Sequence, residues 1–294
     1  MTCLILLNRA LMPSHKQSLF SLHSAVLLFA ISGLFAKWLN MPASHIVFGR
    51  AAFAAATIAL FVLLIRKQSL RVEKSLLLPL AFTGLVLAFH WGSFFYAIQV
   101  SSVAIGLITF ATFPVFVSFL EPMFFKEKFH YQALLQALLT VVGILFILPL
   151  NHLSAGDIEG VIWGMTSAMS FALLTLLNRK FVAKTSAKKV AFYQNACATV
   201  CLLPLMFLYP ITISYQQLSV LIILGVLFTA VAHTLFNHSL KVVKAQTASI
   251  AVSLEPIYGS IAAYFLLGEQ ITVMMVIGGS IVIFTNLWAS KTNS

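Results

Sequence analysis

The chain has 294 residues, of which 61% are hydrophobic and 9% are charged, and its mean hydropathy is +1.00. Soluble globular domains contain about 25% charged residues, so this composition excludes a soluble domain and predicts an integral membrane protein. The net charge of +11 does not indicate nucleic acid as a partner, because the basic residues stand in short connections between apolar runs. The three cysteines form neither a disulfide framework nor a zinc pattern, and we expect no metal site and no cofactor.

Residues 1–19 precede the first long apolar run and contain Arg9 and Lys16. We predict that they form a cytoplasmic N-terminal tail. A cleaved signal peptide is the alternative, because a basic region precedes an apolar run. No small-x-small cleavage site follows Phe35, which argues against cleavage.

Apolar runs of about twenty residues then recur along the chain, and each is long enough to cross a hydrocarbon core of about 30 Å as an α-helix. Short connections that contain Gly and Pro separate these runs. We therefore predict an all-α integral membrane protein with ten transmembrane helices. The predicted spans cover residues 20–38, 45–65, 76–98, 102–125, 131–150, 159–181, 188–209, 217–239, 246–266 and 272–289.

The basic residues predict the orientation of these spans, because Lys and Arg favour cytoplasmic loops. With the N-terminus inside, the inner segments hold all of the 18 Lys and Arg residues except Lys37 and Arg50. The opposite loops contain no Lys or Arg, and their charged residues are the acidic Asp157, Glu159 and Glu269. We expect a multi-pass protein of the cell inner membrane with both termini in the cytoplasm, including a tail at 290–294.

Two halves of the chain share a pattern. At one constant shift, Pro114 and Glu127 of the first half correspond to Pro256 and Glu269 of the second half. An odd number of spans in each half places the two copies in the membrane with opposite orientation. This is the inverted repeat that many secondary transporters use, with a site near the bilayer midplane between the halves.

The repeat divides the chain into a first five-helix unit at 20–150 and a second at 151–289. A rival register pairs Leu120-Glu121-Pro122 with Leu254-Glu255-Pro256. That register loses the shared glutamate after the span and leaves the fourth span too short. We therefore prefer the first register.

These residues resemble the EamA-like family of the drug/metabolite transporter superfamily. The resemblance rests on the proline and the later glutamate in each half, on Arg50 early in the second span, and on Leu254-Glu255-Pro256 in the ninth. It implies two five-helix inverted repeats around a central cavity, and carriers or exporters of amino acids, related metabolites or drugs. The chain departs from the family at Lys126-Glu127-Lys128, where a Gly-Glu pair is usual; Gly268-Glu269 keeps that pair.

Glu255 lies near the centre of the ninth span, next to Pro256. A charged side chain at this depth costs roughly 2.5 to 3.5 kcal/mol on insertion scales. One interpretation is a proton or cation site, or a partner for a substrate ammonium group. The other is a structural hydrogen bond to a neighbouring helix. The first half has Phe113 at the matching position, so this carboxyl group is a feature of the second half alone.

Histidines occur at related depths in both halves, because His90 and Trp91 of the third span align with Ala232 and His233 of the eighth. Asn237 shares a helix face with His233, four residues later. An imidazole inside a membrane can relay protons or donate to a carboxylate. The alternative for each histidine is a packed, hydrogen-bonded side chain.

Arg50 and Lys37 are the basic residues inside or at the edge of predicted spans. Arginine presents a planar fork that suits a substrate carboxylate, whereas lysine is a mobile point charge. Snorkelling toward the membrane surface is the alternative, and we favour it for Lys37. Glu121 lies close to the inner end of the fourth span, where it can pair with Lys126 or Lys128.

Aromatic residues could line a cavity for a flat or amphipathic substrate. With 26 phenylalanines in the chain, most aromatic side chains are expected to pack or to face lipid. Among the aromatic residues we assign two, Trp91 and Tyr258, to the substrate site. The other aromatic candidates are Phe35, Trp38, Trp163 and Tyr193.

The sequence predicts a secondary transporter that exports small metabolites such as amino acids by alternating access. Its partners would be that substrate and the lipid bilayer, with proton exchange or the substrate gradient as the energy source. The alternatives are a channel or facilitator for small solutes and an intramembrane enzyme. An enzyme is disfavoured because His-Glu-x-x-His and Gly-x-Ser-x-Gly motifs are absent from the sequence, and it also lacks a Walker-type loop for ATP.

Overall fold

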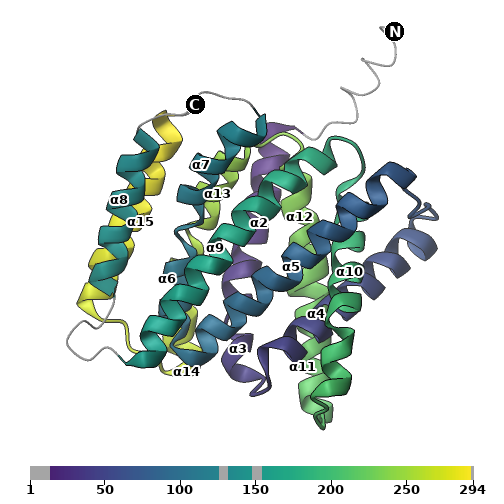
Figure 1. The fold of residues 1–294 in the computed structure, drawn as a ribbon, viewed down its shortest axis with the longest axis horizontal. Helices are drawn as coiled ribbons and strands as arrows, with labels where there is room; N and C mark the ends of the chain where they lie inside the picture. Colours follow the sequence, from purple (N-terminus) through teal and green to yellow (C-terminus); the bar gives the residue numbers. More distant parts are fainter. Residues whose placement is uncertain (1–13, 126–131, 148–153, 293–294) are drawn as a thin grey trace, which may run out of the picture.

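The computed structural model describes residues 14–125, 132–147 and 154–292. Within these residues all regular secondary structure is helical, which confirms the predicted all-α class (Figure 1). The helices are α2 (His15–Ser32), α3 (Phe35–Trp38), α4 (Ala43–Leu60), η1 (Phe61–Ile65), α5 (Lys74–Val100), α6 (Val103–Phe110), α7 (Phe113–Phe125), α8 (Gln132–Ile147), α9 (Ala155–Val182), α10 (Ala187–Leu208), α11 (Tyr215–Gly225), η2 (Val226–Val231), α12 (Ala232–Ser239), α13 (Ala245–Val252), α14 (Glu255–Leu267) and α15 (Val273–Thr292).

Seven helical stretches of the described residues are long and apolar enough to cross a membrane. They match seven of the predicted spans and support a multi-pass membrane protein. The other three predicted spans, 131–150, 246–266 and 272–289, fall on α8, on α13 with α14, and on α15, which are not among these seven stretches. The seven stretches are His15–Trp38, Ala43–Ile65, Lys74–Val100, Val103–Phe125, Ala155–Val182, Ala187–Leu208 and Tyr215–Ser239.

Two of the predicted spans, 102–125 and 246–266, are broken close to a proline. The break between α6 and α7 precedes Pro114, and the break between α13 and α14 precedes Pro256. Proline lacks a backbone N–H group and clashes with the preceding helical turn, so a helix readily ends or restarts there. Phe113 begins α7 and Glu255 begins α14, so the two residues that the repeat aligns occupy the same place in their broken helices.

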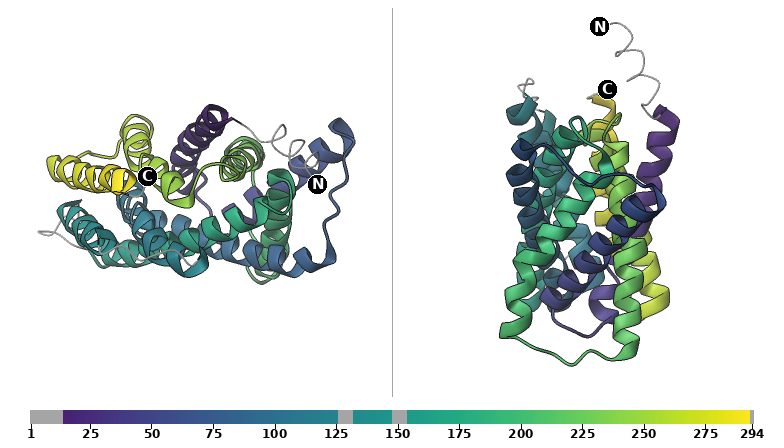
Figure 2. Two further views of the ribbon diagram at one scale, coloured as in Figure 1. Left: turned by 90° about the horizontal axis from the view of Figure 1, so that it is seen from above. Right: turned by 90° about the vertical axis from the view of Figure 1, so that its right-hand side faces the viewer.

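The long helices pack in pairs. α5 runs along α9, α4 along α10, and α2 along α12, while α6 contacts both α9 and α14. Figure 2 shows α8 and α15 side by side at one edge of the bundle, and these two helices also pack against each other. Small residues allow the close approaches, as at Gly84, where an added Cβ atom would lie 2.8 Å from the backbone oxygen of Gln194.

The bundle has two distinct ends. The "terminal end" is the one at which α2 begins, α9 ends and α15 ends; the "far end" is the one at which α9 begins and α14 ends (Figure 1). At the far end, Gly268 adopts the left-handed conformation with φ of 70° and ends α14. Glu269 then accepts hydrogen bonds from the backbone N–H groups of Val103, at 3.0 Å, and Ala104, at 3.4 Å. A carboxylate is favourable at this position, because the start of α6 presents unpaired N–H groups.

Candidate functional site

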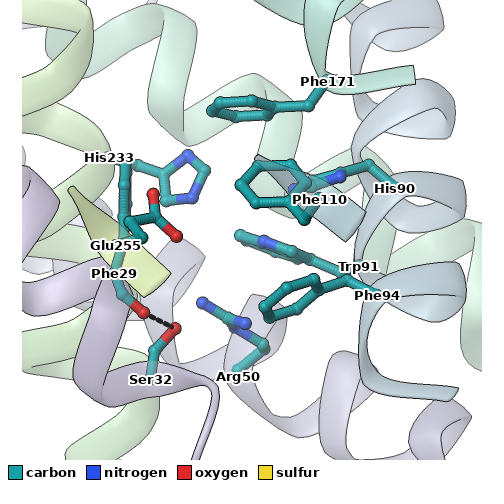
Figure 3. A pocket seen from close by; sticks show the side chains of 10 residues that line it. All are labelled: Phe29, Ser32, Arg50, His90, Trp91, Phe94, Phe110, Phe171, His233 and Glu255. Atoms are coloured by element: carbon teal, nitrogen blue, oxygen red, sulfur yellow. Dashed lines mark hydrogen bonds between the residues drawn. The ribbon is translucent and has the colours of Figure 1, made fainter. Parts of the chain in front are cut away.

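A small cavity lies beside the break that precedes α14. It has a volume of about 20 Å³, which is room for roughly one water molecule. Side chains from α2, α4, α5, α6, α9, α12 and α14 surround it (Figure 3). They are Phe29, Ser32, Arg50, His90, Trp91, Phe94, Phe110, Phe171, His233 and Glu255. The structure thus brings together five of the residues that the sequence singles out: Arg50, His90, Trp91, His233 and Glu255.

Glu255 is the first residue of α14, and only 3% of its surface is exposed. Its carboxyl group points into the cavity on the side of His233 (Figure 3). Among the described residues this group forms no hydrogen bond and no ion pair, so the structural hydrogen bond that the sequence left open is not observed there. The N-terminus of α14 favours a negative charge at this position, because the helix dipole is positive there.

Arg50 of α4 is buried, with 1% of its surface exposed. Its Nε donates to the hydroxyl group of Thr229 at 3.1 Å, and its Nη2 donates to the carbonyl oxygen of Phe228 at 3.5 Å. The guanidinium group stacks over the ring of Trp91, 4.0 Å from its centre. These contacts hold Arg50 inside the bundle and exclude the snorkelling alternative.

Arg50 and Glu255 share the cavity without forming an ion pair, since no N–O distance between them is within 4.0 Å. In Figure 3 the guanidinium group lies below the carboxyl group, on the Trp91 side of the cavity. Two opposite charges inside a membrane are costly unless each has a partner. The arrangement can therefore bind a molecule that carries both a negative and a positive group.

The two histidines differ in how they are held. The Nδ1 atom of His90 lies 2.8 Å from the hydroxyl group of Ser167, and its ring stacks on Phe171 with 4.7 Å between ring centres. The ring of His233 lies between Phe29 and Trp91, at 5.0 Å and 4.8 Å between ring centres, and its Nδ1 atom has no hydrogen-bond partner among the described residues. His233 therefore forms no hydrogen bond among the described residues, whereas His90 uses its Nδ1 atom, and the Nε2 atoms of both rings can still bind a ligand or a proton.

Aromatic rings form the wall of the cavity opposite Glu255 (Figure 3). Phe110 contacts both Phe94 and Phe171, with ring centres 5.3 Å and 5.4 Å apart. Sequence reasoning did not select these residues, nor Phe29 and Ser32. Phenylalanine is too abundant in this chain for the residue type to mark a site, and only helix contacts place these particular rings together.

Three other predicted site residues lie outside the cavity. The ammonium group of Lys37 donates to the carbonyl oxygens of Gln99, at 3.3 Å, and Ser101, at 2.9 Å, so it binds the end of α5. Tyr258 is 38% exposed on α14. Asn237 is fully buried one turn from His233, on the side toward the terminal end.

The remaining candidates make contacts elsewhere. Glu121 of α7 forms an ion pair with Arg179 of α9, a partner that the sequence did not suggest. Lys126 and Lys128, the expected partners, lie outside the described residues, as does Glu127. The rings of the other aromatic candidates pack on neighbours away from the cavity: Phe35 on Trp38 and Phe228, Trp163 on Tyr96, and Tyr193 on Phe192.

Comparison with known proteins identifies a family. The sequence model of the EamA-like transporter family matches residues 17–148 and, a second time, residues 158–290. These two matches cover most of the chain. They agree with the resemblance inferred from the prolines, glutamates and Arg50, and with the expectation that the protein is not an enzyme.

Curated relatives are similar over nearly their full lengths. An uncharacterized transporter of Archaeoglobus fulgidus is 29% identical over 88% of this chain and 91% of its own. An S-adenosylmethionine uptake transporter of Rickettsia prowazekii is 26% identical over 88% and 87%. A pseudopaline exporter of Pseudomonas aeruginosa is 25% identical over 86% and 88%.

A solved crystal structure has the same fold. It superposes with a TM-score of 0.72 over 96% of this chain and all of its own, at 15% sequence identity. Identity this low carries no information about substrate, so the match supports the fold alone.

Proposed function

Because the chain belongs to the EamA-like transporter family, we propose that it is a secondary transporter for a small zwitterionic metabolite, an amino acid or an amino-acid derivative. The observation that carries this proposal is the pair of buried, opposite and mutually unpaired charges, Arg50 and Glu255, in one cavity. A substrate carboxylate binds the guanidinium group of Arg50. The substrate ammonium group binds Glu255.

The aromatic wall adds a preference for substrates with a flat or apolar part. Trp91, Phe110 and Phe171 line the cavity that contains the two charges, on the wall opposite Glu255 (Figure 3). The similar transporters named for S-adenosylmethionine and pseudopaline are consistent with this class, since S-adenosylmethionine is an amino-acid derivative with a flat base. The two relatives differ in direction, one for uptake and one for export. We propose export for this chain.

We propose that ten helices form two inverted repeats that rock around the cavity. The packing supports this arrangement. Each helix of the first half can be exchanged for its counterpart in the second. The contact of α5 with α9 then becomes that of α12 with α2, the contact of α6 with α9 becomes that of α13 with α2, and the contact of α7 with α9 becomes that of α14 with α2. The paired α4 and α10 exchange with each other, as do α8 and α15. Breaks at matching prolines and two family matches point the same way.

The terminal end of the bundle faces the cytoplasm in our proposal, and the membrane is the cell inner membrane. The basic connections support this orientation, since the segment from Arg66 to Lys74 and the connection from Lys184 to Lys189 both lie at the terminal end. Glu159 and Glu269 lie at the far end. Glu255 and His233 are groups of the cavity that can take up a proton, and we propose proton exchange as the energy source.

A carrier is favoured over a channel because of the size of the cavity. A volume of about 20 Å³ holds roughly one water molecule, so a metabolite can enter only when the helices move. A carrier must move in this way during every transport cycle, whereas an open pore need not.

Counterflow in proteoliposomes tests the proposal. Purified protein is reconstituted, the vesicles are loaded with unlabelled amino acids or S-adenosylmethionine, and uptake of the labelled compound is followed. We expect saturable counterflow of at least one zwitterion and none of the matching amine that lacks the carboxylate. Tyr264→Phe, at a residue of α14 that is 47% exposed, serves as the control and should transport normally. Flux that does not saturate, or equal flux of the amine, would contradict the proposal.

A further inference from the structure

A cluster of amide and hydroxyl groups lies buried between the cavity and the terminal end. Its members are Thr175 and Asn178 of α9, Gln194 of α10 and Asn237 of α12, each at most 1% exposed. In this "amide cluster" the Thr175 hydroxyl, the Asn178 nitrogen, the Gln194 oxygen and both polar atoms of Asn237 have no hydrogen-bond partner among the described residues. Buried polar groups in proteins are normally paired, and the penalty for an unpaired one is large inside a membrane.

The amide cluster continues the lining of the cavity. Asn237 follows His233 by one helical turn on the same face of its helix, and Thr175 follows Phe171 by one turn. Both His233 and Phe171 line the cavity. Both helices run toward the terminal end. The helix faces that line the cavity therefore carry polar side chains one turn closer to that end.

Two side-chain contacts and the packing of three helices bring the cluster together. The ring of Phe236, next to Asn237, stacks on Phe171 with 5.6 Å between ring centres, which sets α12 and α9 at the same level. The amide nitrogen of Gln194 donates to the side-chain oxygen of Asn178, which joins α10 to α9. All three helices pack against one another.

The cluster is polar but carries no formal charge. Together its unpaired atoms offer both donors and acceptors. Such groups bind water, carboxylates and ammonium groups weakly enough for release, whereas a fixed charge would retain an ion of opposite sign. Unpaired buried atoms also occur at Ser18 and Asn195, again on the terminal side of the cavity.

We infer that the amide cluster is the hydrated half of the translocation pathway between the cavity and the terminal end. It is closed in this conformation. When α9, α10 and α12 separate, its amides bind water and the carboxylate and ammonium groups of the passing zwitterion. This inference rests on the proposed transport function and adds the route by which the substrate leaves or enters the cavity.

Cysteine accessibility tests the route without requiring that the substrate be known. Asn237→Cys and Asn178→Cys are made in full-length protein with Cys3, Cys197 and Cys201 replaced by Ser, and are treated with a small, charged, water-soluble methanethiosulfonate reagent. We expect labelling when the reagent is on the side of the terminal end and at least tenfold slower labelling from the other side. Leu174→Cys, fully buried on α9 and apolar in the native chain, is the matched control and should stay unlabelled. Equal labelling of this control, or labelling of the two test positions only from the far end, would overturn the inference.

A second variant separates a pathway from a packing defect. Asn237→Leu removes two unpaired polar atoms and breaks no hydrogen bond. We expect a higher melting temperature and at least tenfold slower counterflow in the same preparation. A higher melting temperature with wild-type counterflow would show that the amide cluster plays no part in transport. Failure of the wild-type protein to catalyse any counterflow, together with labelling at Asn237→Cys, would instead count against the proposed substrate class and leave the pathway supported.

Discussion

The guanidinium group of Arg50 stacks over Trp91, with 4.0 Å between the guanidinium carbon and the centre of the ring. An aromatic face and the Thr229 hydroxyl therefore hold this cation, in place of a carboxylate. Glu255 remains in the same cavity without an internal partner among the described residues. A site that kept both charges paired with each other would have to break that pair before it could bind a zwitterion.

Arg50→Lys should weaken substrate binding although the charge is retained. A lysine ammonium group cannot stack as a plane on Trp91 while it also presents two parallel donors to a carboxylate. We expect the half-saturating concentration in counterflow to rise by about tenfold, which corresponds to about 1.4 kcal/mol. Arg66→Lys, on an exposed residue at the terminal end, is the matched control. An unchanged half-saturating concentration in Arg50→Lys would remove Arg50 from the site.

Glu255→Gln should stop transport of zwitterions while making the protein more stable. Glutamine has nearly the same shape as glutamate but does not carry a charge into the membrane interior. The substitution leaves an amide of the same size and removes a buried charge that has no partner among the described residues, so it should raise the free energy of unfolding by about 1 to 3 kcal/mol. Thermal unfolding in detergent and counterflow in proteoliposomes measure the two effects. A variant that transports zwitterions as well as the wild type would show that the carboxylate is not needed.

Glu121 and Arg179 should be coupled energetically. The Glu121 side chain is 7% exposed and that of Arg179 is 23% exposed, so the pair is partly shielded from solvent. We expect Glu121→Gln and Arg179→Gln each to lower the free energy of unfolding, by about 1 to 3 kcal/mol. The double variant should cost less than the sum of the two single losses, because contacting residues are not additive. Strict additivity in this cycle would mean that the ion pair contributes nothing to stability.

Gly164 and Gly92 form a matched pair of helix glycines with opposite expectations. A Cβ atom at Gly164 of α9 would collide with the Thr109 side chain of α6, whereas one at Gly92 of α5 would meet no atom within 4 Å. Gly164→Ala should lower the free energy of unfolding, by about 1 to 3 kcal/mol. Gly92→Ala should raise it by up to about 1 kcal/mol, because alanine restricts the unfolded chain. If the two variants had the same melting temperature, the result would contradict the close approach of α6 to α9 at Gly164.

Composition and local rules were enough to predict much of the fold. Hydropathy predicted the helices, and the constant shift between the halves aligned Pro114 with Pro256, the two prolines that follow the breaks. The two charged residues of the cavity were also visible in the sequence, because an apolar span does not need Arg50 or Glu255 for its own stability. For such residues the cost of burial is itself the signal.

Other features depend on contacts between distant segments. Lys37 was a candidate ligand until its ammonium group was seen to bind the carbonyl oxygens at the end of α5. Glu121 forms an ion pair with Arg179 of α9, a partner that no local pattern in the sequence indicated. Phe171 gives no local signal among so many phenylalanines. In each case the residue type determines which contacts the side chain can make, and the packing of the helices determines which neighbour it contacts.

The contact of Glu269 with the first N–H groups of α6 has a mechanical consequence. It ties the segment that follows α14 to the start of the broken helix in the other half of the chain, through two hydrogen bonds to a charged group. We therefore expect α6 and α14 to move together at the far end and to act as a hinge there. The larger displacements of the working cycle should then occur at the opposite end, where α9, α10 and α12 enclose the amide cluster.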